Sequence, residues 1–328
     1  LALWKNSLCG EVPAGLGVNS PLMEVDLSSN QLTGPIPQGL CASRVLKKLI
    51  LFTNHMNGPI PTGLSHCHSL RRVRIQGNLF NGTFPSALGS LPYVYYLDIS
   101  SNNLNGNLDD FTWNMPSLQV LHLQSNHFRG SIPPSLLKTS KSLFTLDLSH
   151  NALSGSIPPE IGSLSELNTF NVSGNAIEGE MNDGLLKCVK MVSLDLSNNS
   201  LSGQIPPRLA NMKMLSTLDI SCNKLSGSIP FELGGMESLV FVNVSFNHLS
   251  GKLPLNGAFM NINASAIQGN EGLCGGTSLG PCTPRSSSEA TNANISLKSR
   301  IIAILLLICL LLAMACLCHL IWKLKQVG

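Results

Sequence analysis

The sequence predicts an α/β fold, in which a right-handed solenoid of short coils carries a parallel β-sheet on its concave face and is followed by one transmembrane helix. Two observations lead to this prediction. An asparagine that follows a pair of apolar residues occurs at eleven positions, separated by a nearly constant interval. One long uncharged apolar segment lies near the C-terminus. Self-similarity at a fixed period is typical of a chain that stacks one small unit many times.

Each unit is predicted to be a short strand followed by a turn. Apolar residues five and three positions before each asparagine, such as Leu49 and Leu51 before Asn54, point to one face of a strand. We expect the asparagine side chain to bond to the backbone of its own turn and of the neighbouring coil. Nine intervals of 24 residues and one of 25 separate these residues: Asn6, Asn30, Asn54, Asn78, Asn102, Asn126, Asn151, Asn175, Asn199, Asn223 and Asn247.

A glycine and then an Ile-Pro pair follow most of these turns, as in Gly34 and Ile36-Pro37. Glycine allows backbone conformations that other residues resist, and proline has no N–H for a ladder, so it belongs at an edge or a bend. Two copies, at 106–109 and 179–182, lack the proline. We expect these copies to weaken the side ribbon locally and to leave the main sheet intact.

These features resemble the leucine-rich repeat, and the Leu-x-Gly-x-Ile-Pro element resembles its plant extracellular subclass. The resemblance covers about residues 1–275 and implies a horseshoe in which stacked coils share one core. We expect about eleven repeats over 1–255 and a C-terminal cap over 256–282. Leu1 already occupies a strand position with no cap before it, so we expect the natural protein to continue upstream.

The C-terminal part resembles the end of a plant receptor ectodomain. The cap of such receptors contains a disulfide, which the resemblance assigns here to Cys274 and Cys282. A juxtamembrane linker is expected over 283–300, and a cytoplasmic stub over 323–328. Between them, Ile301 to Trp322 is a run of 22 residues without charge, long enough at about 1.5 Å per residue to span a bilayer.

Potential glycosylation sites indicate the orientation in the membrane. Six Asn-x-Ser/Thr sequons all precede the apolar segment: Asn81, Asn171, Asn198, Asn243, Asn263 and Asn294. Glycans are added on the lumenal side, so we expect a single-pass plasma-membrane protein with its N-terminal part outside the cell. Asn171 and Asn243 fall on the concave strands, where occupancy is less expected.

The remaining cysteines predict no disulfide framework. Cys67 and Cys188 hold the same position in their repeats, so we expect both to be buried thiols. Cys9, Cys41 and Cys222 are scattered and are expected to be unpaired.

Signals for chemistry are absent from the sequence. His66 and His68 could contact a metal, but no further ligand accompanies them, so we predict neither a metal site nor a cofactor. The chain has no phosphate-binding loop, kinase catalytic loop or nucleophile elbow. We therefore predict that this chain is not an enzyme.

Candidate binding residues lie six, four and two positions before each asparagine, where side chains face outward from the concave sheet. Later repeats hold the same small set there, as in Thr145, Asp147 and Ser149. The early repeats differ, which makes them the predicted recognition surface. Its candidate residues are Lys48, Phe52, Arg72, Arg74, Gln76, Tyr96 and His122.

Charge points to the same repeats. The stretch from Leu27 to Leu97 contains no Asp or Glu but six Lys and Arg residues, in a chain of net charge +3. Arg72 and Arg74 are two apart on one strand, so they project from the same face about 7 Å apart. Two guanidinium groups so placed can hold one carboxylate from both sides. The alternative is a solvated basic face without a ligand; nucleic acid is not an expected partner outside the cell.

The early repeats resemble the CLAVATA, HAESA and TDIF-receptor group of plant receptor kinases. The resemblance rests on Val25-Asp26-Leu27-Ser28-Ser29-Asn30, Leu49-Ile50-Leu51-Phe52, Cys67-x-Ser69-Leu70-Arg71-Arg72-Val73-Arg74, Asn81-Gly82 and Leu91-Pro92. It implies that Arg72 and Arg74 recognise the free C-terminal carboxylate of a short secreted peptide. It also implies further repeats upstream, an intracellular Ser/Thr kinase that this chain lacks, and a leucine-rich-repeat co-receptor kinase that docks near the C-terminal repeats.

Three functions remain open from the sequence. The first is the membrane-proximal part of a peptide-hormone receptor kinase. The second is a kinase-less receptor-like protein that acts as a decoy or scaffold, and the third is a defence protein that binds a microbial enzyme along its concave face.

Overall fold

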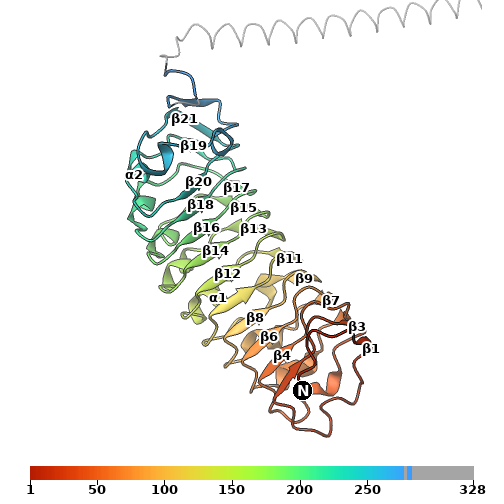
Figure 1. Ribbon diagram of the computed structural model, residues 1–328. Coiled ribbons are helices and arrows are strands. Elements are labelled where there is room, and N and C mark those ends of the chain that lie inside the picture. The colour runs from red at the N-terminus through yellow and green to blue at the C-terminus, as the bar shows by residue number, and fades with distance from the viewer. Residues whose placement is uncertain (277–278, 283–328) are drawn as a thin grey trace, which may run out of the picture. The chain divides into compact units, whose positions relative to one another are not determined.

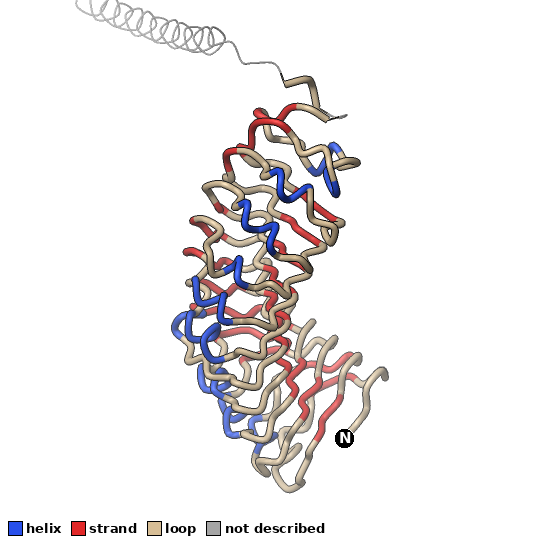
Figure 2. The backbone as a smooth tube through the Cα atoms, turned by 90° about the vertical axis from the view of Figure 1, so that its left-hand side faces the viewer, coloured by secondary structure: helices blue, strands red, loops and turns tan. Residues whose placement is uncertain are grey.

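The computed structural model describes residues 1–276 and 279–282. Leu1–Pro281 form one compact unit, and a second unit, 282–328, is described only at Cys282. Within the first unit, strands line the inner side of a curved solenoid and short helices follow its outer side (Figures 1 and 2).

Several predicted features lie outside the described residues. They are the linker at 283–300, the transmembrane helix at 301–322, the cytoplasmic stub at 323–328 and the sequon at Asn294. Among the residues that the structure does describe, no helix is long and apolar enough to cross a membrane.

The main sheet has ten parallel strands that follow one another in chain order, each one coil further along the solenoid (Figure 1). The strands are β2 (Glu24–Asp26), β4 (Lys48–Ile50), β6 (Arg72–Arg74), β8 (Tyr96–Asp98), β10 (Val120–His122), β12 (Thr145–Asp147), β14 (Thr169–Asn171), β16 (Ser193–Asp195), β18 (Thr217–Asp219) and β20 (Phe241–Asn243). The parallel sheet predicted from the asparagine period is therefore confirmed. We call its solvent-facing surface the concave face.

The single 25-residue interval does not disturb this sheet. Val120 on β10 still pairs with Thr145 on β12. The interval contains α1 (Pro134–Thr139), a six-residue α-helix where most coils have shorter 3-10 helices. The longer coil therefore differs on the outer side, and the register of the strands is kept.

Short helices make up the outer side. Besides α1 they are η1 (Gln38–Cys41), η2 (Thr62–His66), η3 (Ser86–Ser90), η4 (Leu108–Asp110), η5 (Pro159–Ser163), η6 (Leu185–Lys187), η7 (Pro207–Asn211), α2 (Phe231–Gly234), η8 (Gly257–Phe259) and η9 (Ala264–Ala266). Between them and the main sheet, the inward-facing apolar residues form one continuous core.

Shorter strands form the side ribbon. A seven-stranded sheet contains β5 (Asn57–Pro59), β7 (Leu79–Thr83), β9 (Asn103–Asn107), β11 (His127–Gly130), β13 (Ala152–Ser156), β15 (Ala176–Gly179) and β17 (Ser200–Leu201). Smaller sheets at the two ends contain β1 (Cys9–Glu11) with β3 (Gln31–Thr33), and β19 (Ser226–Gly227) with β21 (His248–Lys252) and β22 (Gly272–Cys274).

The ribbon corrects one prediction. The two copies without proline contribute β9 and β15, and both strands remain paired on each side. The expected local weakening is wrong, because these strands end two or three residues before the position where the proline would stand. The ribbon is interrupted one repeat later instead. There β17 and β19 belong to separate sheets, and an isolated bridge between Gln204 and Ser226 links the two coils.

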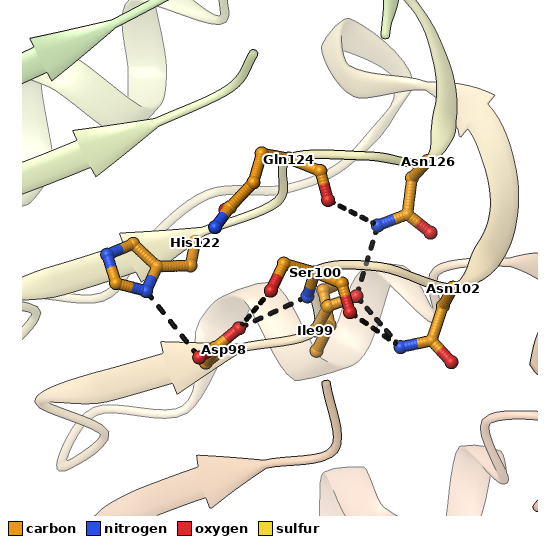
Figure 3. A network of polar contacts seen from close by, with 7 residues as sticks. All are labelled: Asp98, Ile99, Ser100, Asn102, His122, Gln124 and Asn126. Atoms are coloured by element: carbon orange, nitrogen blue, oxygen red, sulfur yellow. Dashed lines mark hydrogen bonds and ion pairs between the residues drawn. The ribbon is translucent and has the colours of Figure 1, made fainter. Parts of the chain in front are cut away.

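The repeated asparagines are the hydrogen-bonding spine of the solenoid. The amide of Asn126, 5% exposed, donates to the carbonyls of Leu123 (3.1 Å) and Ile99 (3.1 Å), as Figure 3 shows for Ile99. Its oxygen accepts from the N–H of Leu104 at 3.0 Å. The predicted role is confirmed, since the asparagines from Asn30 to Asn247 make the same set of bonds.

The asparagine spine continues into the predicted cap. Asn270 donates to the carbonyls of Val244 (3.0 Å) and Ile267 (3.1 Å) and accepts from the N–H of Leu249 (3.0 Å). Asn270 was not predicted to belong to the series, because it follows Asn247 by 23 residues instead of 24. The first part of the cap region therefore has the geometry of another coil.

The cysteines differ from prediction at two positions. Cys41 and Cys67 form a disulfide with 5.5 Å between their Cα atoms, so the expectation of an unpaired Cys41 and a free buried Cys67 is wrong. Their places in the two coils differ by two residues, so matching positions in the repeat did not reveal that η1 and η2 bring them together. Cys274 and Cys282 are each disulfide-bonded; that they pair with each other stays a prediction.

Within the described residues the other thiols follow the prediction. Cys188 is free and buried, and burial raises the pKa of its thiol to about 11. Cys9 is free and exposed, and Cys222 is free and half-buried.

Removing the disulfide by Cys41→Ala with Cys67→Ala is expected to lower the free energy of unfolding by about 3 kcal/mol, because the link closes a loop of 26 residues in the unfolded chain. Urea unfolding of the full chain would measure this change. The control is Cys9→Ala, which removes an exposed free thiol and should shift stability by no more than about 0.5 kcal/mol. Equal midpoints for the double variant and the wild type would contradict the prediction.

Candidate ligand-binding site

Four neighbouring strands, β4, β6, β8 and β10, arrange the predicted site residues in three rows across the concave face. Strand register defines the first two rows, and the third follows two residues further along each chain. The first row is Lys48, Arg72, Tyr96 and Val120; the second is Ile50, Arg74, Asp98 and His122; the third is Phe52, Gln76, Ser100 and Gln124. The structure thus brings all seven candidate residues together.

Arg72 and Arg74, which we call the arginine pair, lie against aromatic rings. The guanidinium carbon of Arg74 is 4.2 Å from the ring centroid of Phe52 and 5.8 Å from that of Tyr96. The guanidinium carbon of Arg72 is 4.9 Å from the ring of Tyr96. An aromatic face attracts a cation, so the rings hold both side chains over the sheet.

The arginine pair has no carboxylate partner. Neither guanidinium forms an ion pair within residues 1–276 and 279–282, and both Nε atoms are buried without a hydrogen-bond partner. A buried unpaired donor is unfavourable for the free protein. An anionic ligand that accepts from these groups would satisfy them.

Lys48 differs from the arginine pair. Its Nζ lies 3.0 Å from Oε2 of Glu24 on β2, and both side chains are 45% exposed. Glu24 stands just before the acid-free stretch, so this ion pair was not predicted from the sequence. Lys48 therefore lies in the first row as predicted, but its charge is already compensated.

Asp98 is a site residue that the sequence analysis missed. It is 5% exposed, and its Oδ1 accepts from the backbone N–H (3.2 Å) and the hydroxyl (2.7 Å) of Ser100. Its Oδ2 lies 3.5 Å from Nδ1 of His122 (Figure 3). The imidazole of His122 also meets the edge of the Tyr96 ring, with 6.0 Å between centroids.

An Asp-x-Ser motif explains why Asp98 was not predicted as a site residue, and it also explains the position of the site. On five of the ten strands of the main sheet an aspartate oxygen accepts from the serine two residues later, as Asp147 does from Ser149 and Asp195 from Ser197. Strands β4, β6 and β10 have neither this motif nor an asparagine in the place of its aspartate. On these strands the outward side chains are not used to bind the local backbone, so they are available to a ligand; Asp98 lies between two of them.

Two glutamines complete the third row. Oε1 of Gln76 and Oε1 of Gln124 are buried without a hydrogen-bond partner, one on each side of Ser100 in the row. Unpaired acceptors of this kind suit a ligand that offers N–H groups. No cluster of three or more metal-binding side chains occurs in the described part of the chain.

The predicted glycosylation sites take different environments. Asn81, Asn198 and Asn263 are exposed. Asn171 and Asn243 are half-buried on β14 and β20. The side-chain oxygen of each accepts from the serine two residues later, so they take the place of aspartate in the Asp-x-Ser motif.

Two family models match the chain. The model described as "Leucine rich repeat" matches residues 68–128 and 116–177. A second model of the same description matches 21–43, 190–212 and 214–236. The chain belongs to the leucine-rich-repeat family. A comparison with curated proteins found no match.

Solved plant receptors have the same fold. The Arabidopsis receptor kinase HAESA, in complex with the peptide hormone IDA and the co-receptor SERK1, is 37% identical with a TM-score of 0.79, over 84% of this chain and 46% of that chain. The plant peptide hormone receptor RGFR1, in complex with RGF2, is 33% identical with a TM-score of 0.72, over 82% and 47%. A TDR receptor is 28% identical with a TM-score of 0.75, over 85% and 48%.

This leucine-rich-repeat chain thus has the fold of a plant receptor ectodomain, which is not a catalytic fold. It spans about half the length of the receptor chains that it matches.

Proposed function

We propose that this leucine-rich-repeat protein binds a short secreted peptide on its concave face and that the arginine pair binds the free C-terminal carboxylate of the peptide. The observation that carries the proposal is the state of Arg72 and Arg74: both are fixed against aromatic rings, and neither has a carboxylate partner among the described residues. The similarity to HAESA and RGFR1, whose structures contain peptide hormones, supports it.

The other residues take supporting roles in this proposal. Phe52 and Tyr96 hold the guanidinium groups, while Gln76 accepts N–H groups of the peptide. His122 borders the site on the side of the later repeats, and Lys48 borders it on the other side. Each charge-assisted hydrogen bond to the carboxylate contributes about 1.5–3 kcal/mol once water is excluded.

The proposal includes a place in the cell and partners. Residues 301–322 would anchor the protein in the plasma membrane, with the repeats (1–255) and the cap (256–282, closed by Cys274–Cys282) outside. A leucine-rich-repeat co-receptor kinase would dock near the C-terminal repeats, and a Ser/Thr kinase outside this chain would carry the signal. The presence of SERK1 in the HAESA complex supports the co-receptor.

The test starts from a pool of synthetic peptides with random sequence and free C-termini. The full chain is used to retain binders, which are identified by mass spectrometry and resynthesised as free acids and as C-terminal amides. Amidation should weaken binding about 10- to 100-fold, because it removes the charge that the arginine pair binds. Equal affinities of acid and amide would refute the carboxylate proposal.

A further inference from the structure

The arginine pair is followed along the second row by a carboxylate and an imidazole. Arg74 on β6 pairs in register with Asp98 on β8, which pairs with His122 on β10. Neighbouring strands are about 4.8 Å apart, so a ligand carboxylate on Arg74 lies close to Asp98. The Asp98 oxygens are directed to Ser100 and His122, and no ion pair joins Asp98 to Arg74 within the described residues.

The charges of these side chains limit what the site accepts. Lys48 and Glu24 compensate each other, the arginine pair supplies two positive charges, and Asp98 supplies one negative charge. The site therefore has one net positive charge while His122 is neutral. One ligand carboxylate brings it to neutrality, and a second carboxylate would be placed near Asp98 without compensation. Because Asp98 is 5% exposed, water screens it poorly.

We propose that Asp98 is a specificity-determining residue that makes the site reject a peptide whose last residue carries a second carboxylate. This inference rests on the proposed function and deepens it. The preferred ligand ends in a residue whose only negative charge is the terminal carboxylate.

The test compares two peptides that differ in one group. A carboxylate-dependent binder from the peptide pool is made with asparagine or with aspartate at its last position, both with a free C-terminus. At pH 7.5 the wild-type full chain should bind the asparagine form about tenfold more tightly. Asp98→Asn should reduce this ratio to about twofold or less at the same pH.

The chain itself offers templates and a control for this variant. Asn171 and Asn243 occupy the position of Asp98 in their coils, and their side-chain oxygens accept from Ser173 and Ser245 as Asp98 does from Ser100. Asparagine at position 98 is therefore compatible with the fold. Asp195→Asn makes the same change four coils further along the sheet and should leave the ratio at about tenfold.

Both substitutions create an Asn-x-Ser sequon. All proteins are therefore produced with a glycosylation inhibitor present, and intact mass measurement must show that positions 98 and 195 carry no glycan. Enzymatic removal of glycans is not suitable, because it would convert the new asparagine back to aspartate.

The outcomes distinguish this inference from the function on which it rests. If Asp98→Asn keeps the tenfold ratio, or if the wild type shows no preference while binding still depends on the arginine pair, Asp98 is not the determinant. If the asparagine peptide binds equally well without the arginine pair, the proposed function itself fails.

Discussion

Replacing Arg72 and Arg74 together by alanine should weaken the binding of a free-carboxylate peptide by about a hundredfold, or about 3 kcal/mol. The substitutions remove two charge-assisted donors that are already placed over the sheet by Phe52 and Tyr96. Isothermal titration of the full chain with one peptide would measure the loss. The C-terminal amide of that peptide should lose little further affinity in the double variant, because both changes remove the same interaction.

A matched control removes the same amount of charge from exposed positions in the same coil and in the preceding one. Arg44 and Arg71 are exposed and lie outside the three rows of the concave face. Replacing both by alanine should reduce affinity by less than about threefold, since exposed charges contribute little. Similar losses of affinity in the two double variants would show that the peptide is bound by the general positive charge of this region. No loss of affinity in Arg72→Ala with Arg74→Ala would refute the proposal that the arginine pair binds the carboxylate.

Replacing Asn126 by alanine should lower the free energy of unfolding by about 4 kcal/mol. The substitution leaves the N–H of Leu104 without its acceptor and removes the donor shared by the carbonyls of Leu123 and Ile99. Both coils that flank Asn126 lose contacts, so the effect is not confined to one turn. Urea unfolding followed by circular dichroism would measure it.

Asn105→Ala is the control for this stability change. Asn105 is exposed on β9, and its side chain makes no hydrogen bond among the described residues. Its replacement should change stability by less than about 0.5 kcal/mol. A loss of similar size in both variants would mean that the asparagine spine is not a special source of stability.

The main sheet could be predicted from the sequence because each coil repeats the same local rule. Two inward apolar residues and one asparagine determine where the strand lies, which of its side chains face the core, and where the chain turns, as in Leu49, Leu51 and Asn54. The coil with Asn270 was missed because its interval is one residue shorter. The Cys41–Cys67 disulfide was missed because it depends on how two outer helices stack, which the strand period does not determine.

The site could be predicted in part. Counting from the asparagines placed Arg72, Arg74 and Tyr96 on one surface, and the register of the strands brings them together. The sequence could not show that Glu24 forms an ion pair with Lys48 or that His122 contacts Asp98. Both contacts join side chains about one coil apart and depend on rotamers, which a repeat pattern does not specify.

The coil between Asn126 and Asn151 is one residue longer than its neighbours, yet Val120 and Thr145 remain paired. The length of a coil can therefore change without changing the positions of the side chains that contact a ligand. An insertion among the outer helices does not move the rows that meet a ligand, whereas a substitution at one of three outward positions changes those rows alone. Selection can consequently alter ligand preference one side chain at a time, while the outer side of the solenoid diverges in length.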